Sequence, residues 1–207
     1  MCMTQCYPIR ELMQIMVSSI GTITGSLSDE ETNSFLMLIE QAERIYVSGA
    51  GRSGFVAKAF AMRLMHLGMT SYVVGETVTP AFLKTDTLIA FSGSGTTDSI
   101  LEVCQTVHKI GGTLCLITAT RNSPMANLAD KLVILDTDEA GYIQEGPDHF
   151  DIRQLTGEHR SLSHPCAPLG TLFETCALIL TDSIITALME MKHCSMEDIV
   201  HRYTNMQ

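Results

Sequence analysis

One stretch decides the fold: LIAFSGSGTTDS, residues 88–99. An apolar run ends at Phe91, hydroxyls and glycines follow as far as Thr97, and a helical apolar pattern begins at Ile100. A strand, a small polar loop and a helix start together suit an anion, because glycines let the backbone approach closely and the helix start offers N–H groups. We therefore expect this loop to bind a phosphate. A hydroxyl-rich cap on a crossover helix is the alternative.

Four more short apolar runs flank this stretch, at residues 45–47, 72–74, 113–117 and 132–135. They are continuous rather than alternating, which is typical of parallel strands covered on both faces. Helical periodicity separates them at 55–67 and 99–110, and a shorter helix is expected near 125–129. The sequence therefore predicts an α/β fold: a three-layer α/β/α sandwich with a five-stranded parallel sheet of flavodoxin-like type. Ligands of such sheets bind beyond the carboxyl ends of the strands.

Helical arms are expected on both sides of the sheet. Residues 9–20 carry an apolar face, and Ser28 with Glu31 has the form of a capping box, in which Glu31 reaches back to the cap. This N-terminal hairpin is expected to pack on the sheet or on another subunit. Residues 172–191 predict a buried helix, and 195–203 a shorter one. We expect one domain over 1–207, with an arm at 1–43, the sheet core at 44–135, a variable loop at 136–168 and C-terminal helices at 169–207.

Composition narrows the function classes. The chain has 207 residues, 45% of them hydrophobic, and a formal net charge of −10. Nucleic-acid binding needs clustered Lys and Arg, so it is not expected. No continuous apolar run approaches the ~18 residues of a membrane span, and the N-terminus lacks the pattern of a secretory signal. Seven cysteines without framework spacing indicate a reducing, cytoplasmic location, with Cys104, Cys115 and Cys176 as core thiols.

The loop 136–168 is polar and has no periodicity. Its histidines (His149, His159 and His164) and Cys166 match no compact metal-ligand spacing. We expect no metal here. Loops of this length are lids, subunit contacts or disordered segments.

The first strand ends in SGAGRSG, residues 48–54, which contains the G-x-G-x-x-G pattern, and the acidic Glu76 follows the second strand. Together they resemble a dinucleotide-binding fingerprint. Two features weaken an interpretation as an NAD site. Arg52 and Ser53 would crowd a pyrophosphate but suit a compact anion with hydroxyls, and the loop 92–97 offers a second anion site that a dinucleotide does not require.

Two carboxylates could carry chemistry. Glu76 closes the second strand and could bind sugar hydroxyls or cap a loop. Glu174 lies near the start of the apolar helix 172–191. It is either a partner of the helix dipole or a partly desolvated base with a raised pKa.

Five motifs occur in order along the chain: GAGRSG (49–54), AMRLMHLG (61–68), VGETVTP (74–80), SGSGTT (92–97) and GTLFE (170–174). With them the chain resembles the SIS (sugar isomerase) superfamily, and within it the 6-phospho-3-hexuloisomerase family. The resemblance covers essentially the whole length except the loop 136–168. The SGSGTT loop marks the superfamily, and the other motifs are more specific.

The resemblance implies a cofactor-free isomerase that interconverts D-arabino-3-hexulose 6-phosphate and fructose 6-phosphate in the ribulose monophosphate pathway. It further implies a homotetramer whose sites are shared between subunits. Glu174 is the expected base, transferring a proton through an enediolate that Arg52 and Ser53 stabilise. The expected substrate-binding residues are Gly51, Arg52, Ser53, Glu76, Thr77, Ser92, Ser94, Thr96 and Thr97.

A second acid/base is expected near the C-terminus, where the family has a His reaching a neighbouring subunit. If Asn205 is aligned with the family ending, Tyr203 stands at that position and His201 lies two residues earlier. Either Tyr203 takes the role or His201 does after a shift, and the two side chains would lie on different faces of a helix. His66, on an apolar helix face, is expected to be a structural residue with its hydrogen bonds satisfied.

Three alternatives stay open beside this hypothesis. The chain could be a non-catalytic sugar-phosphate-binding protein, an isomerase of another sugar phosphate, or a dinucleotide-binding protein. The departure at Tyr203 favours the first alternative.

Overall fold

The computed structural model describes residues 8–136, 171–195, 197 and 200–203. Its sheet contains β1 (Ile45–Gly49), β2 (Ser71–Val73), β3 (Thr87–Phe91), β4 (Thr113–Thr118) and β5 (Lys131–Ile134). All neighbouring strands pair in parallel, in the order β2-β1-β3-β4-β5. This is the flavodoxin-like order, so the predicted sheet is confirmed.

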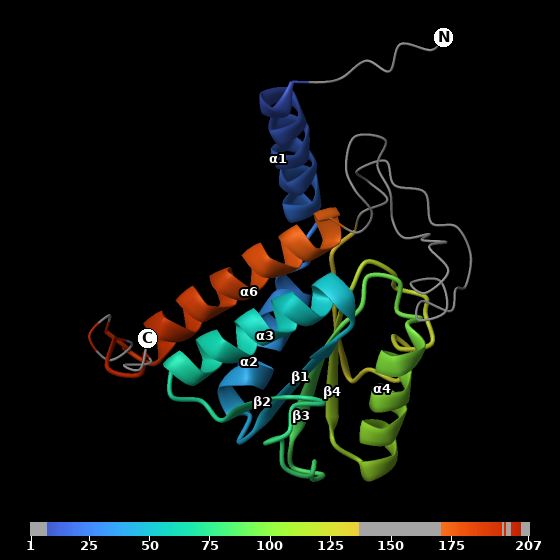
Figure 1. Cartoon of the computed structure of the whole chain (residues 1–207), viewed down its shortest axis with the longest axis vertical. Coiled ribbons are helices and arrows are strands. Elements are labelled where there is room, and N and C mark those ends of the chain that lie inside the picture. Colours follow the sequence, from blue (N-terminus) through green and yellow to red (C-terminus); the bar gives the residue numbers. More distant parts are fainter. Residues whose placement is uncertain (1–7, 137–170, 196, 198–199, 204–207) are drawn as a thin grey trace.

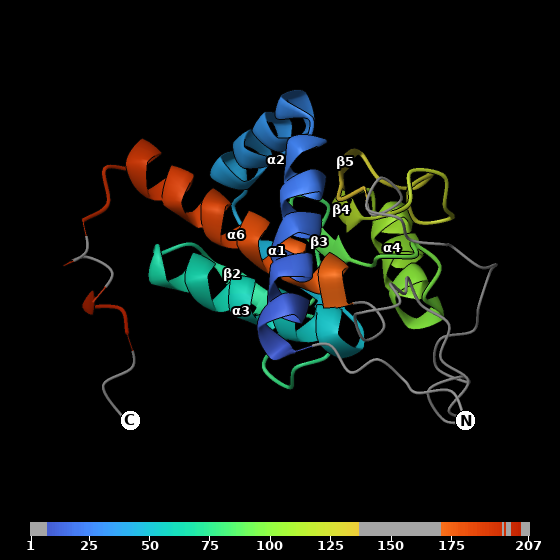
Figure 2. The same cartoon turned by 90° about the horizontal axis from the view of Figure 1, so that it is seen from above.

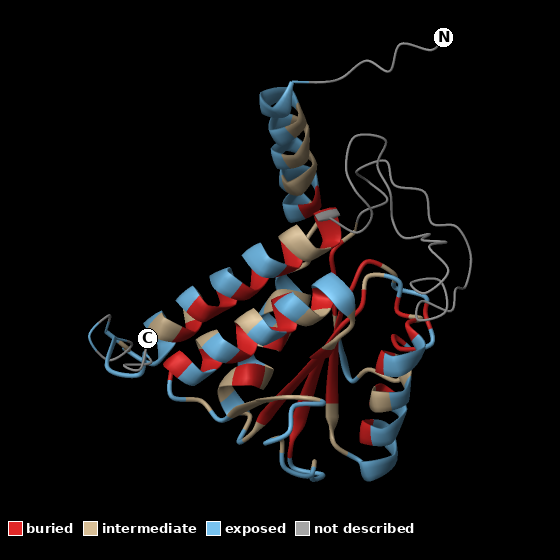
Figure 3. Ribbon diagram, in the orientation of Figure 1, coloured by how far each residue is buried: buried red, intermediate tan, exposed pale blue. Residues whose placement is uncertain are grey.

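Helices cover both faces of the sheet (Figures 1 and 2). On one face α2 (Asp29–Gln41), α3 (Gly51–His66) and α6 (Thr171–Met191) pack against the sheet through residues such as Phe35, Phe60 and Leu188. On the other face α4 (Asp98–Ile110) packs through Ile100 and Cys104. The central strands β1, β3 and β4 and the inward sides of these helices are largely buried, whereas the edge strand β2 is only half-buried (Figure 3). The three-layer α/β/α sandwich is therefore confirmed.

The N-terminal helix α1 (Ile9–Gly25) stands apart from these layers and projects from the body (Figure 1). Its side chains Ile9, Met13 and Val17 are 78%, 61% and 67% exposed, and Ile23 at its end is buried. The predicted apolar face of α1 is therefore divided: Ile9, Met13 and Val17 are exposed, whereas Met16 and Ile20 pack against the core.

The capping box at the start of α2 is half right. The Ser28 hydroxyl accepts a hydrogen bond from the Glu31 N–H at 3.3 Å, as predicted. The Glu31 carboxylate does not reach back to the cap. It accepts hydrogen bonds from Arg121 at 2.7 Å and from the Ile134 N–H at 3.2 Å. Ile134 lies on the edge strand β5, where its N–H has no strand partner among the described residues. This N–H and the Arg121 cation are better hydrogen-bond donors for the Glu31 carboxylate than the N–H at the helix cap.

A predicted helix near 125–129 is wrong. Residues 124–128 form turns, in which Leu128 and Ala129 donate to carbonyls three residues earlier. The Met125 N–H donates to the Gly95 carbonyl at 3.2 Å, outside the segment. The segment therefore combines local turn hydrogen bonds, such as that from the Asn127 N–H to the Ser123 carbonyl at 3.1 Å, with a bond to the loop after β3.

The helix α6 is confirmed over its predicted range, and by length and composition it could cross a membrane. Half of that apolar window is buried inside the protein, where Phe173, Ala177 and Leu188 join the core. The apolar composition of α6 is thus that of a core helix. Of the predicted helix 195–203, Glu197 and Val200 are helical and the chain turns at His201. The loop 137–168 lies outside the described residues.

The buried thiols follow the prediction. Cys104, Cys115 and Cys176 are free and buried, and Cys194 is half-buried. Burial raises the pKa of Cys104 to about 12 and that of Cys176 to about 11. These thiols therefore stay protonated at neutral pH and act as small apolar side chains.

The turn from β1 into α3 depends on the close approach of two backbones. A Cβ on Gly54 would lie 2.6 Å from the Gly49 carbonyl oxygen, and a Cβ on Gly49 would lie 2.8 Å from the Ser53 backbone. Any side chain here would push the first turn of α3 away from β1. The first and last glycines of the G-x-G-x-x-G pattern are therefore explained by strand–helix packing, and the middle one, Gly51, by its φ of 55°.

We predict opposite effects of the same substitution at two glycines. Gly54→Ala should lower the free energy of unfolding by about 1–3 kcal/mol through overpacking. Gly21→Ala, where a Cβ meets nothing within 4 Å, should raise it by about 0.5–1 kcal/mol, because alanine favours a helix interior. Urea unfolding at one protein concentration measures both. Equal effects would contradict the close approach described above.

Candidate active site

The candidate site lies where the connections of the sheet reverse direction, between β1 and β3. These strands pair in parallel, with Gly49 opposite Phe91 at their carboxyl ends. The loop into α3 and the loop into α4 therefore leave the sheet side by side, about 5 Å apart. Ligands of doubly wound sheets bind at this switch point.

The loop after β3 is held by its own hydroxyls. Ser92 is buried, and its Oγ accepts a hydrogen bond from the Gly95 N–H at 3.1 Å. The Thr96 hydroxyl donates to Ser94 Oγ at 3.0 Å, and the Ser92 and Thr97 hydroxyls lie 3.4 Å apart. Gly95 has φ +64° and packs tightly on Ser123, so no other residue fits there without strain.

This loop leaves donors free for an anion. The backbone N–H groups of Gly93 and Ser94 make no hydrogen bond within the part of the chain that the structure describes. Thr97 caps α4 without a side-chain hydrogen bond to the helix start. Free N–H groups, exposed hydroxyls and the positive end of α4 therefore meet at one spot, as expected of a phosphate site.

Glu174 lies in the first turn of α6, next to the first turn of α3. The two helices run side by side, and Arg52 Nε lies 3.5 Å from Glu174 Oε2. The Glu174 side chain is 13% exposed and that of Arg52 58%. Oε2 is buried and accepts no hydrogen bond within the described residues. A buried carboxylate therefore faces an exposed guanidinium, and the catalytic roles of Glu174 and Arg52 stay predictions.

Burial raises the pKa of Glu174 above its ordinary value. The positive charge of Arg52 opposes this shift, and so does the nearby Ser53 hydroxyl. A carboxylate that is desolvated and short of hydrogen bonds takes up a proton readily. A raised pKa is a property that a general base at neutral pH needs, and the choice between a base and a helix-dipole partner stays a prediction.

Glu76 has a different partner from the one expected. Its Oε1 lies 2.6 Å from Lys58 Nζ, and both side chains are half exposed. Thr77 beside it is exposed. Lys58 lies six residues after Arg52 on α3, roughly 120° away around the helix axis, and was not singled out in the sequence. The sugar-binding role of Glu76 and Thr77 stays a prediction.

The C-terminal residues lie at the other end of α3. Tyr203 stacks on His66 with ring centroids 4.1 Å apart, and its hydroxyl accepts a hydrogen bond from Arg63 at 2.9 Å. His201 is exposed. Because a helix rises 1.5 Å per residue, His66 lies about 20 Å along α3 from Arg52. Within one chain neither His201 nor Tyr203 meets Glu174, so the role of either as second acid/base stays a prediction.

His66 is buried, as expected of a structural residue, but its hydrogen bonds are not all satisfied. Its Nδ1 has no partner among the described residues. Burial lowers the pKa of His66, and the neighbouring Arg63 lowers it further. The ring is therefore a neutral imidazole that packs against Tyr203.

The matched family model is named SIS domain and covers residues 38–146. The chain belongs to the SIS domain family. A protein of Archaeoglobus fulgidus without an assigned function is 38% identical, over 92% of this chain and 96% of its own. A protein of Mycobacterium gastri named 3-hexulose-6-phosphate isomerase is 31% identical, over 94% of this chain and 89% of its own.

The fold of this SIS chain also matches solved structures. A crystal structure of a Methanococcus jannaschii protein, for which a molecular function as 3-hexulose-6-phosphate isomerase was inferred, is 31% identical with a TM-score of 0.75. The match covers 95% of this chain and 99% of that one.

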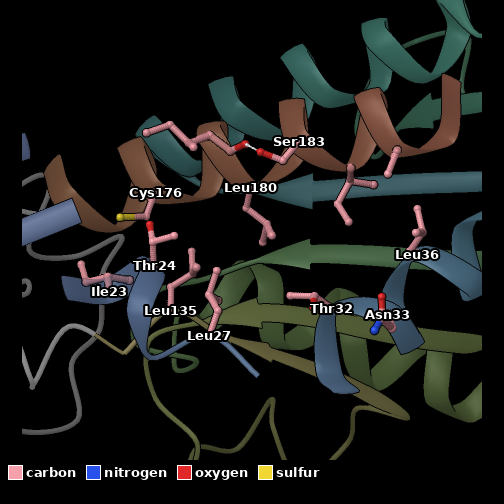
Figure 4. Close-up of a pocket in the computed structure, with 13 residues that line it drawn as sticks. Ile23, Thr24, Leu27, Thr32, Asn33, Leu36, Leu135, Cys176, Leu180 and Ser183 are labelled. Atoms are coloured by element: carbon pink, nitrogen blue, oxygen red, sulfur yellow. Dashed lines mark hydrogen bonds between the residues drawn. The ribbon is translucent and has the colours of Figure 1, made fainter. Parts of the chain in front are cut away.

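A cavity of about 270 Å³ lies away from this candidate site, between α6 and the N-terminal hairpin (Figure 4). The residues that line this cavity include Ile23, Leu27, Leu135, Cys176 and Leu180, which are labelled in Figure 4. None of its lining residues is charged. It therefore does not suit a phosphorylated ligand.

No group of three or more His, Cys, Asp or Glu side chains among the described residues could hold a metal ion. The histidines of the loop 136–168 and Cys166 lie outside the described residues.

We predict that Arg52 controls the protonation of Glu174. Arg52→Gln removes a positive charge that stabilises the carboxylate, so the pKa of Glu174 should rise further above its ordinary value. A ¹³C NMR titration of the glutamate side chains measures this shift. Lys58→Gln is the matched control, because Lys58 pairs with Glu76, and it should leave the Glu174 titration unchanged. An unchanged or lower pKa in Arg52→Gln would refute the electrostatic coupling.

Proposed function

We propose that this SIS protein is a sugar-phosphate isomerase that interconverts D-arabino-3-hexulose 6-phosphate and fructose 6-phosphate. One observation carries the proposal: a buried Glu174 carboxylate, without a hydrogen bond on Oε2, faces Arg52 near a loop rich in free anion donors. The name of the 31% identical relative from Mycobacterium gastri supports the choice of substrate.

The reaction moves a carbonyl from C3 to C2. Glu174 would take the proton from C2 of the 3-hexulose, which leaves a 2,3-enediolate, and would return that proton to C3. A proton also passes between the oxygens on C3 and C2, so the atoms balance. Arg52 would stabilise the negative charge that develops on these oxygens.

The phosphate would act as the anchor. Ser92, Ser94, Thr96 and Thr97 would surround it with the N–H groups of the loop, and Ser53 would lie toward the reacting carbons. Binding energy at the phosphate then orients carbons that lie several bonds away. The net charge of −10 means that these local donors, rather than the overall field, must attract the ligand.

A coupled assay tests the proposal. The purified protein is supplied with D-arabino-3-hexulose 6-phosphate, and fructose 6-phosphate is converted through glucose 6-phosphate to an NADPH signal. Turnover supports the proposal. Turnover of D-arabinose 5-phosphate alone would show another isomerase, and tight binding of fructose 6-phosphate without any turnover would show a non-catalytic binding protein. A titration with NAD tests the dinucleotide alternative.

Glu174→Gln is predicted to lower kcat while it raises the free energy of unfolding. Loss of a general base should lower kcat by about 10²–10⁴-fold while fructose 6-phosphate still binds. The raised pKa of Glu174 means that its charged form destabilises the fold, so the neutral amide should raise the free energy of unfolding at pH 8. Retained activity would remove Glu174 as the base.

The proposal also includes a cytoplasmic homotetramer with sites shared between subunits. Free Cys104, Cys115 and Cys176 support a reducing location, and the exposed apolar side chains of α1 support subunit contacts. Within one chain, Tyr203 and Glu174 lie near opposite ends of α3. A C-terminal residue that reaches the site of a neighbouring subunit would be consistent with this separation.

Subunit mixing tests the shared site. If His201 is the second acid/base across a subunit boundary, His201→Ala and Glu174→Gln should each be inactive alone. Oligomers mixed from equal amounts should recover about a quarter of the sites, since each site takes one residue from each subunit. Tyr203→Phe is tested in parallel. Full activity of both tail variants, or no recovery on mixing, would contradict the shared site.

A further inference from the structure

One backbone oxygen in the loop after β3 receives an unusual number of hydrogen bonds. The Gly93 carbonyl accepts from the Ala119 N–H at 3.0 Å and from the hydroxyls of Thr118 and Thr120, each at 3.1 Å. A carbonyl oxygen has two lone pairs, so three donors from one short segment hold it more firmly than an ordinary loop carbonyl. All three donors come from the carboxyl end of β4 and the residues after it.

Holding this oxygen fixes the direction of the next N–H. In a trans peptide the C=O and the N–H point in opposite directions, and the structure contains no cis peptide among its described residues. Gly93 O points to the end of β4, so the Ser94 N–H points away from β4. Since β3 lies between β4 and β1, this direction leads toward Arg52 and Ser53 at the end of β1.

Two neighbouring carbonyls are turned inward as well. The Ser92 carbonyl accepts from the Gly95 N–H and the Gly95 carbonyl from the Met125 N–H, each at 3.2 Å. Carbonyl oxygens repel phosphate, whereas the N–H groups of Gly93 and Ser94 attract it. The inward carbonyls therefore turn a flexible Gly-Ser loop into a fixed set of donors, which costs little reorganisation when an anion binds.

We propose that Thr118 and Thr120 are positioning residues for phosphate binding: by holding the Gly93 carbonyl they aim the Ser94 N–H at the phosphate of the substrate. This inference rests on the proposed function for the identity of the phosphorylated ligand. Neither hydroxyl touches the reacting carbons. They act through the peptide between Gly93 and Ser94.

The segment that carries these hydroxyls is itself anchored. Thr118 is fully buried, and its Oγ1 also accepts the Thr120 N–H at 3.1 Å. Arg121 pairs with Glu31 on α2 at 2.7 Å. Ser123 is buried under Gly95, and its Oγ accepts the Ala126 N–H at 3.2 Å. The loop after β3 is therefore braced by a rigid neighbour.

The experiment replaces hydroxyls by methyl groups of the same size. Thr118→Val, Thr120→Val and the double variant are compared with Thr106→Val, whose hydroxyl donates to the Glu102 carbonyl on α4 away from the loop. The probes are fructose 6-phosphate and inorganic phosphate, titrated by calorimetry and followed at the Ser94 amide by ¹H–¹⁵N NMR. Thr118→Ser and Thr120→Ser keep a hydroxyl and serve as rescue variants.

The double variant should bind both probes about tenfold more weakly, the size expected for two lost hydrogen bonds that share one acceptor. KM should rise about tenfold, with kcat changed by about twofold at most. The Ser94 amide should no longer respond to phosphate as it does in the unmodified protein. The serine variants and Thr106→Val should bind as the unmodified protein does.

Unchanged phosphate binding and an unchanged Ser94 response in a folded double variant would overturn the inference. Equal losses in the serine variants would also overturn it, because the hydroxyl would then not be the cause. If the unmodified protein binds phosphate at Ser94 but turns over no sugar phosphate, the proposed isomerase fails while the positioning role stands. If it binds neither probe, both are overturned.

Discussion

The parallel pairing of β1 with β3 is the constraint on which the rest of the site depends. Gly49 lies opposite Phe91, so the two loops that carry polar groups begin at the same level of the sheet. The crossover helices then diverge to opposite faces, and the space between the loops stays open to ligands. The close contact between Gly54 and Gly49 keeps the first turn of α3 over this space. A shift of one residue in this register would separate Arg52 from the phosphate loop.

Burial of the Glu174 carboxylate lowers the stability of the folded protein when this group is charged. The folded state raises the pKa of this carboxyl above its ordinary value of 4.5. The folded protein therefore holds the proton more tightly than the unfolded chain, and this contribution to stability is complete below that value and is lost as the pH rises through the folded-state pKa. The positive charge of Arg52 limits this loss of stability, although Arg52 makes no hydrogen bond to the buried Oε2 of Glu174 among the described residues. Packing of α6 against α3 is what keeps the unfavourable charge in position.

Most of the fold could be predicted from the sequence because each strand is a continuous apolar run. The runs at 87–91 and 113–117 could only be buried strands, and the loops after them followed from their glycines and hydroxyls. Long-range partners could not be predicted in the same way. Glu31 looked like a local cap, yet its carboxylate bonds Arg121 and Ile134, residues about a hundred positions away in the chain. The sequence pattern around Glu31 does not indicate which edge strand or which cation the fold places beside its carboxylate.

The same limit applies within the site. Arg52, Ser53 and Glu174 were predicted because motif and chemistry agreed, and the structure brings Arg52 and Glu174 together, while their roles stay predictions. Lys58 had no motif and was missed, although it holds Glu76. The hydroxyls of Thr118 and Thr120 were not singled out in the sequence, because their acceptor, the Gly93 carbonyl, lies in another loop. A residue that hydrogen bonds to the backbone of a distant segment produces no recognisable pattern in the sequence around it.

The charges of the site are divided between its two ends. The loop 92–97 contains no Lys or Arg, and Arg121, on the segment that braces it, is paired with Glu31. The phosphate end therefore offers neutral donors, whereas the charged pair of Arg52 and Glu174 lies at the other end. Neutral donors hold a dianion less tightly than a cluster of cations would, because they supply no net charge. In the proposed isomerase, this division would ease release of the phosphorylated product: directional N–H groups would fix its orientation, and the Arg52 charge would lie where negative charge develops.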